Sequence, residues 1–158
     1  MVVKILIRMK AYSMINAQIK NTIKFPKAFL FVEDLHDVAT KFIVPDIQGR
    51  MVMEQDLRGV RYPPLAPSTL KRKARLGLSM QILAATGKLR TSIFSQIQGK
   101  TKVIISIKPE RFDIGEHLQI NGVNTKRGKR FFNFFGISSI AEKKSIEYLK
   151  RKIQNAKP

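Results

Sequence analysis

The chain has 158 residues, no cysteine and a formal net charge of +19, with 30 basic residues against 11 acidic ones. Disulfides and thiolate-ligated metals are therefore excluded, and the length predicts one domain with its own core. The charge predicts a polyanion or an acidic protein face as partner, because so large an excess otherwise repels itself. No apolar run reaches the length of about 20 residues that a membrane-spanning helix needs, so we expect no membrane partner.

The N-terminal segment predicts a strand followed by an undecided stretch. Apolar residues alternate with basic ones over residues 3–10, which is typical of a half-buried strand. The same basic residues interrupt the apolar core that a signal peptide would need, so we expect a protein that works inside a cell or in something assembled there. Residues 11–25 stay open between strand and loop, and residues 1–25 are treated as an N-terminal strand arm.

A long helix is predicted from Pro26 onward. Apolar residues recur at steps of three and four between Phe29 and Ile43, which indicates one buried stripe. Pro45 should end or kink this helix. The helical pattern resumes over residues 46–59, where the final glycine is a plausible stop.

The middle of the chain predicts a loop and short helices. Three prolines between residues 60 and 68 disfavour regular structure. Ser68 or Thr69 should cap a short helix that ends near Arg75. A second short helix is predicted over residues 79–85, where a following Thr-Gly pair breaks it and a further turn starts.

The C-terminal half predicts a hairpin and two helices. Residues 94–98 and 103–108 read as strands joined through Gly99. A short helix over residues 112–122 is followed by a basic tip at 123–130, which we expect to be mobile. Residues 138–158 predict a helix, with the capping box formed by Ser139 and Glu142. The expected fold is therefore α+β: a long N-terminal helix, a small antiparallel sheet with a hairpin, short helices and a C-terminal helix, all in one domain spanning residues 1–158.

A phenylalanine-rich segment lies between Arg130 and Gly136. Four of its seven residues are phenylalanine, so a strand there would be apolar on both faces and would need two covers. An internal core or a neighbouring subunit can supply the second cover, and both interpretations stay open.

The sequence predicts no catalytic, cofactor or metal site. His36 and His117 are the only two histidines, and neither has enough ligand partners at suitable spacing for a metal. No nucleophile elbow and no glycine-rich phosphate loop is present. We therefore expect that the protein is not an enzyme.

The charge pattern is more informative than any chemical motif. No acidic residue occurs between Asp56 and Glu110, a stretch that contains the basic cluster Lys71, Arg72, Lys73 and Arg75. A second cluster consists of Lys126, Arg127, Lys129 and Arg130. Such residues can contact phosphates without reading bases, or they can meet acidic faces of partner proteins, and both options stay open.

Two spaced motifs follow the proline-rich loop. The first consists of Pro64, Leu65, Thr69 and Lys73, and the second of Leu83, Thr86, Gly87, Leu89, Ser92 and Ile93. With these motifs in this order, the chain from about Phe29 onward resembles the phage virion morphogenesis family, typified by the Mu-type tail-completion proteins. Looser matches to the family pattern are His117, Gly122, Arg130, Phe132 and Gly136, and Tyr62 stands where the family usually has tryptophan.

The resemblance implies a structural subunit without cofactor at the head–tail junction of a virion assembled in the host cytoplasm. Such a subunit would be a tail-completion protein, a neck protein, a head–tail connector or a tail terminator. It would form a ring, a hexamer or dodecamer, and would contact portal-adaptor, neck or tail-tube proteins. Contact with genomic DNA stays an option, and the alternative function is a free basic nucleic-acid-binding protein. The candidate interface residues are Tyr62, Pro63, Pro64, Leu65, Thr69, Lys71, Arg72, Lys73, Arg75, Thr86, Gly87, Lys126, Arg127, Lys129, Arg130 and Phe132.

Overall fold

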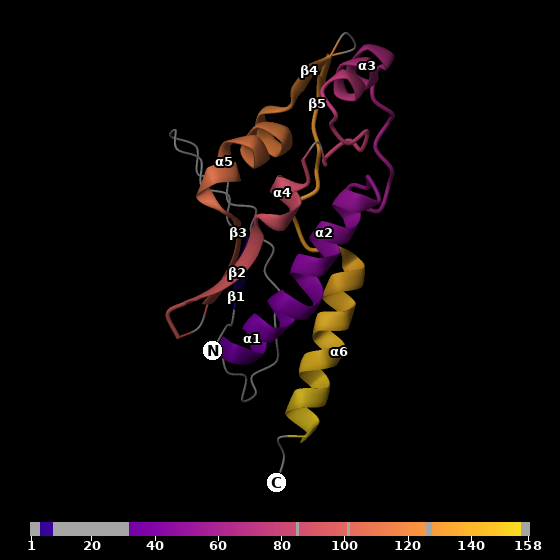
Figure 1. Cartoon of the computed structure of the whole chain (residues 1–158). Helices are drawn as coiled ribbons and strands as arrows, with labels where there is room; N and C mark the ends of the chain where they lie inside the picture. The colour runs from indigo at the N-terminus through magenta and orange to yellow at the C-terminus, as the bar shows by residue number, and fades with distance from the viewer. Residues whose placement is uncertain (1–3, 8–31, 85, 101, 126–127, 156–158) are drawn as a thin grey trace. The chain divides into compact units, whose positions relative to one another are not determined.

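The chain folds as a mixture of helices and small sheets. The computed structural model describes residues 4–7, 32–84, 86–100, 102–125 and 128–155 (Figure 1). Over these residues the α+β class is confirmed. The residues form two compact units: the first draws on Met1–Asp46, Phe94–Ser106 and Gly136–Pro158, and the second on Ile47–Ile93 and Ile107–Phe135. Because the chain passes repeatedly from one unit to the other, no linker in the sequence marks the division.

The long N-terminal helix is present over Val32–Val52. It consists of α1 (Val32–Val38), the π-helical turn η1 (Ala39–Ile43) and α2 (Val44–Val52). Pro45 does not end the helix, contrary to one of the two expected outcomes. In a regular helix a proline ring clashes with the carbonyl of the residue four positions earlier. Here that carbonyl lies in the π turn, where the wider helical turn leaves room for the ring. Pro26, the predicted start, lies outside the described residues, and the helix ends before Gly59.

The first unit contains a three-stranded sheet of β1 (Lys4–Ile7), β2 (Ile93–Gln98) and β3 (Lys102–Ile107), in the order β1-β3-β2. The predicted hairpin of β2 and β3 is confirmed, and its turn uses Gly99 at φ +67°. The predicted N-terminal strand is also present, and it pairs with β3 in parallel, Lys4 opposite Lys102. The undecided residues 11–25 lie outside the described part of the chain.

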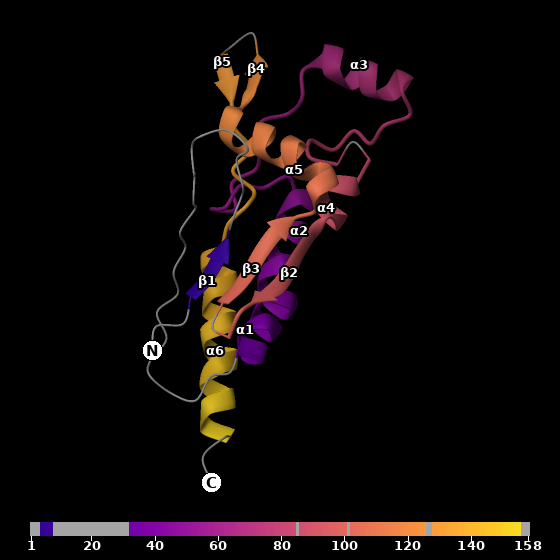
Figure 2. The same cartoon turned by 90° about the vertical axis from the view of Figure 1, so that its left-hand side faces the viewer.

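The central strand β3 is covered on both faces. Val103, Ile105 and Ile107 are buried as predicted, and the intervening Ile104 is only 6% exposed. One cover comes from the long helix: in Figure 2 the sheet lies in front of α1, and Ser95 of β2 hydrogen-bonds Thr40 at 3.0 Å. A central strand buried on both sides explains why its apolar residues run without strict alternation.

The C-terminal helix α6 (Ser139–Asn155) packs against α1 and η1. Its cap is Ser138 rather than the predicted Ser139: the Ser138 hydroxyl accepts a bond from the Ala141 N–H at 3.1 Å and donates to Asp46 at 2.8 Å. Leu149 is buried as predicted, while Ile146 and Ile153 are only partly covered.

Polar side chains also join α6 to α1. Asp37 accepts hydrogen bonds from Lys41 at 2.9 Å and from the Tyr148 hydroxyl at 2.8 Å, and these two bonds hold the pKa of its carboxyl below the ordinary value. Lys152 forms a second link with Asp34 at 3.3 Å. Exposed pairs of this kind contribute little individually, so the apolar contact between the helices supplies most of their stability.

The second unit is built from short elements. They are α3 (Pro67–Arg75), α4 (Lys88–Thr91), α5 (Pro109–Glu116), the π turn η2 (His117–Asn121), β4 (Val123–Thr125) and β5 (Gly128–Arg130). The predicted helix at 112–122 is confirmed as α5 with η2, although it begins earlier, and Gly122 ends it at φ +70°. The basic tip predicted at 123–130 is the antiparallel β4–β5 hairpin, except for residues 126–127, which lie outside the description.

Two expectations about the middle of the chain are wrong. Neither Ser68 nor Thr69 caps α3, since its N-cap is Ala66 without a side-chain bond, and Pro67 occupies the first turn, where a missing N–H is tolerated. The helix predicted at 79–85 is absent from its described residues, 79–84, which form bends and irregular structure. Hydrogen bonds between side chains and backbone groups hold this segment instead.

The phenylalanine-rich segment forms the core of the second unit. Phe132, Phe134 and Phe135 are at most 5% exposed, whereas Phe131 is 52% exposed. The segment is irregular and belongs to no strand, and the buried Arg50 guanidinium donates to the Phe134 carbonyl at 2.8 Å. Three of the four rings are therefore buried within the chain itself, and the Phe131 ring is exposed.

Candidate interface

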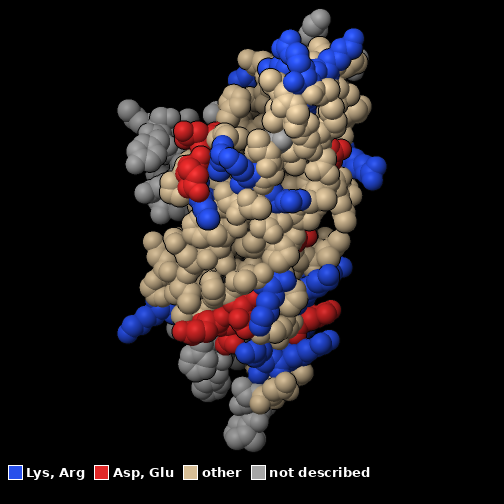
Figure 3. Space-filling view, in the orientation of Figure 1, with Lys and Arg blue, Asp and Glu red and all other residues tan. Residues whose placement is uncertain are grey.

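The basic cluster of α3 is divided between two sides of the helix. Lys71, Arg72 and Arg75 are exposed, and their side chains make no hydrogen bond or ion pair with any described residue. With Ser68 they occupy the helical positions i, i+3, i+4 and i+7, which share one face. In Figure 3 basic side chains gather over α3 and the β4–β5 hairpin. These three cations are thus presented to solvent in a fixed pattern.

Lys73 belongs to the opposite side of α3, which corrects its placement in the predicted contact surface. Its residue is 8% exposed, and its ammonium donates to the Ser79 carbonyl at 2.9 Å and to the Gln81 carbonyl. Burial lowers the pKa of Lys73, which the negative charge of Glu54 partly offsets. Lys73 therefore holds the chain after α3 and is not available to a partner.

Further side chains fix the segment that follows α3. The Glu54 carboxylate accepts a hydrogen bond from the Ile82 N–H at 2.7 Å, and the Gln81 amide donates to the Val52 carbonyl at 3.5 Å. Since Val52 ends α2 and Glu54 lies two residues later, the segment after α3 is tied to the end of the long helix. These bonds replace the helix that the sequence predicted there.

Three predicted interface residues, Tyr62, Arg130 and Phe132, form an internal cluster instead of an open surface. The rings of Tyr62 and Phe132 meet edge to face with 5.2 Å between centroids. The Arg130 guanidinium stacks 4.8 Å from the Phe132 ring centre and donates to the Pro63 carbonyl. The cluster fixes the proline-rich loop onto the strand that leads into the phenylalanine core.

The polar ends of this cluster are buried. The Tyr62 hydroxyl and the Arg130 Nε are enclosed and find no hydrogen-bond partner among the described residues. Burial raises the pKa of Tyr62, and the charge of Asp56 raises it further. Tyr62, Arg130 and Phe132 therefore stabilise the unit, while Pro63 and Pro64 remain exposed beside them.

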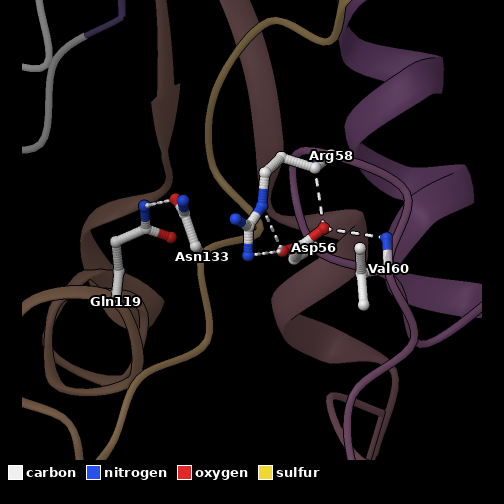
Figure 4. Close-up of polar contacts among 5 residues, drawn as sticks. All are labelled: Asp56, Arg58, Val60, Gln119 and Asn133. Atoms are coloured by element: carbon white, nitrogen blue, oxygen red, sulfur yellow. Dashed lines mark hydrogen bonds and ion pairs between the residues drawn. The ribbon is translucent and has the colours of Figure 1, made fainter.

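A compact turn precedes the proline-rich loop (Figure 4). The Asp56 carboxylate accepts bonds from the N–H groups of Arg58 and Val60 at 2.8 and 2.9 Å, and the Arg58 guanidinium adds an ion pair at 3.1 Å. Burial alone would raise the pKa of Asp56, but these bonds outweigh it and lower the pKa. The Leu57 N–H also donates to the Asn133 carbonyl at 2.9 Å, which joins the turn to the phenylalanine segment.

Asp56→Asn is expected to lower the free energy of unfolding by about 1–3 kcal/mol at pH 7, because an amide cannot replace a charged acceptor of several bonds. A carboxyl whose pKa is lowered on folding stabilises above its unfolded pKa of about 3.9, and this contribution is lost as the pH falls through the folded value. Urea unfolding at pH 7 and at pH 3 should show the difference from wild type shrinking in acid. Glu147→Gln, on an exposed carboxylate of α6, should show no such loss, and equal costs at both pH values would contradict the assignment.

The second motif lies mostly in the core. Gly87 adopts the left-handed conformation with φ +71°, which a side chain disfavours, and it opens α4. Leu83, Leu89 and Ile93 are at most 7% exposed. The buried Ser92 hydroxyl donates to the Leu89 carbonyl at 2.6 Å. Within this motif Thr86 is exposed and Gly87 is half-buried, so the motif mainly shapes the unit.

The remaining predicted residues are only partly placed. Leu65 and Thr69 are half-buried, and Lys129 is exposed on β5. Lys126 and Arg127 lie outside the described residues. Of the sixteen candidates, the structure brings Lys71, Arg72 and Arg75 together on one open face.

Neither histidine lies in a metal site within the described part of the chain. His36 Nε2 lies 3.3 Å from the Ser95 hydroxyl, and His117 is exposed. The described residues contain no group of three or more histidine, cysteine or acidic side chains that could hold a metal ion. They also include no helix with the length and apolar character needed to cross a membrane.

Sequence reasoning missed an acidic face on α5. Glu110, Asp113, Ile114 and His117 are all exposed and stand at the helical positions i, i+3, i+4 and i+7. Acidic side chains gather over α5 in Figure 3. The signal was present in the spacing of these residues, but the predicted helix began at Phe112 and so left out Glu110.

Comparison of the chain with known protein families, curated proteins and solved structures found no match.

Proposed function

We propose that this protein is a structural subunit of a tailed phage or phage-like particle, where it completes the tail or joins it to the head at the neck as part of a ring. The observation that carries the proposal is the pair of spaced motifs, from Pro64 to Lys73 and from Leu83 to Ile93, by which the chain resembles the phage virion morphogenesis family.

The geometry of the motif residues supports this reading. Lys73 secures the chain after α3, Gly87 allows the turn into α4, and Leu89 anchors α4 in the core. These residues hold α3 in place with its basic face toward solvent. A preformed face costs less conformational entropy on docking than a flexible one, which suits a protein whose function is assembly.

The distribution of apolar surface also supports an assembling second unit. Nine large apolar residues of the described chain are well exposed, and seven belong to this unit: Val52, Met53, Val60, Leu76, Met80, Ile114 and Phe131. Only Ile97 and Ile140 belong to the first unit. Isolated exposed apolar residues are ordinary, but their concentration in the unit that also carries the basic face favours protein contacts there.

The alternative, a free nucleic-acid-binding protein, is favoured by the three cations of α3, which form no ion pair with any described residue. Phosphate contacts of this kind release counterions, so the logarithm of the affinity would fall with the logarithm of salt at a slope of about −0.9 per contact. Tight, salt-sensitive retention of bare duplex DNA by a monomer would favour this alternative. Weak DNA retention by a protein that copurifies with particles would favour the tail or neck role.

Localisation in the particle tests the proposal directly. In particles purified from cells that produce this chain with a small tag, imaging should find the tag on the particle axis, between head and tail. Removal of the gene should leave filled heads and tails that fail to join, or tails without a proper end. Absence of the chain from finished particles would refute the proposed function.

A further inference from the structure

Two exposed helix faces of the second unit have opposite charges and a similar layout. The basic face on α3 contains Lys71, Arg72 and Arg75, and Leu76 at the end of the helix is 58% exposed beside them. Leu76 stands four residues after Arg72, so both side chains lie on the same side of the helix. The face is therefore cationic with an apolar residue at one end.

The acidic face on α5 contains Glu110, Asp113 and Ile114, and Ile114 is 44% exposed. The two carboxylates make no hydrogen bond or ion pair with any residue that the structure describes. By contrast, Glu54 and Asp56 of the same unit are engaged by backbone N–H groups. The spare acidic charge of the unit thus lies on α5, again beside an exposed apolar side chain.

These two faces do not neutralise one another within a molecule. In both Figure 1 and Figure 2, α3 and α5 lie apart. Although the protein has few acidic residues, charges of both signs on separate faces of one unit lack an ion-pair partner among the described residues. Two copies of the chain can pair them, because each copy offers both faces at once.

We propose that the α3 face of one copy docks on the α5 face of the next copy. Arg72 and Arg75 then lie opposite Glu110 and Asp113, and Leu76 packs against Ile114. This contact uses two different surfaces of the same chain, so it is heterologous, and it closes into a ring when the rotation between neighbours allows. The inference rests on the proposed function, because it names the partner of the basic face within the ring.

A second copy fits these faces better than DNA does. A phosphate backbone would use the cations of α3, but it would offer no apolar contact for Leu76 and no partner for the carboxylates of Glu110 and Asp113. Protein interfaces combine apolar residues with a charged rim, as these faces do. The charged contacts are exposed, so salt should weaken the association.

A charge exchange tests the docking. The full-length chain is studied by sedimentation velocity at low salt over a range of concentrations, as wild type, as Arg72→Glu with Arg75→Glu, as Glu110→Lys with Asp113→Lys, and with all four changes. Each pair of changes places like charges opposite one another and should weaken self-association at least about tenfold. The chain with all four changes restores opposite charges and should associate to within about threefold of wild type.

The matched control is Lys143→Glu with Lys150→Glu, two exposed lysines of α6 whose reversal changes the net charge as much as the α3 variant does. It should associate as wild type does, and circular dichroism should show all variants folded. A monomeric wild type, equal loss in the control, or no recovery in the fourfold variant would overturn the inference. If those results occur while the chain is still found at the head–tail junction, the docking fails and the proposed function stands.

Discussion

Replacing Lys71, Arg72 and Arg75 together by serine is expected to lower the yield of infectious particles about a hundredfold. The three side chains share one exposed face of α3 and make no hydrogen bond or ion pair with any described residue. If each contributes about 0.5–1 kcal/mol to a contact in the particle, their joint loss lowers the association constant by about one to two orders of magnitude. Assembly repeats that contact around a ring, which amplifies the effect on yield.

The same triple change should leave the isolated protein folded. Exposed substitutions usually change the free energy of unfolding by less than about 0.5 kcal/mol each, and the lost interaction with the negative end of α3 adds only a fraction of a kcal/mol. Urea unfolding of the purified variant measures this, and a plaque assay measures the yield. The matched variant replaces Lys143, Lys150 and Arg151 of α6 by serine. Normal yield from the α3 variant, or an equal loss from the α6 variant, would show that the α3 face has no specific role.

Lys73→Ala is expected to have the largest effect on stability among the basic residues of α3, about 2–4 kcal/mol. The substitution removes a buried stem, whose loss leaves a cavity, and two charge-assisted hydrogen bonds to the carbonyls of Ser79 and Gln81. Lys73→Met keeps most of the volume and should cost about 1–2 kcal/mol, because it loses the bonds but also removes the cost of burying an ammonium.

Urea unfolding of both Lys73 variants, with Lys71→Ala as the control, separates these contributions. Lys71 is exposed only two residues earlier on the same helix, so its removal should change the free energy of unfolding by less than about 0.5 kcal/mol. Hydrogen exchange should also accelerate at Ile82, which belongs to the segment that Lys73 holds. If Lys73→Ala is as stable as Lys71→Ala, the buried hydrogen bonds do not hold that segment.

Local sequence patterns predicted most of the helices and strands. Gly99 between two β-rich runs identified the hairpin, and Gly122 marked a helix end correctly, because each glycine adopts a positive φ that other residues disfavour. The spacing of apolar residues likewise identified the long helix. The cap at Ser138 was placed at Ser139 because the two neighbouring serines offer the same cap chemistry.

Contacts between residues that are distant in the sequence determine which of the predicted interface residues are exposed. Lys73 and Lys71 are the same residue type two positions apart, yet one binds carbonyls in the unit and the other faces solvent. Arg130 and Tyr62 looked like exposed contact residues, and the ring of Phe132 draws both into an internal cluster. No periodicity within either segment carries information about a partner almost 70 positions away.

By itself, the sequence determined the charge excess, the lack of cysteine and the α+β class, since these follow from composition and from the periods of 3.6 and 2 residues. Only the tertiary structure decided which cations of α3 are open, that β1 joins β3 in parallel, and that the spare acids lie on α5. The physical reason is that burial and hydrogen bonding between distant segments select the outward side of each helix, whereas local propensity selects only that a helix forms.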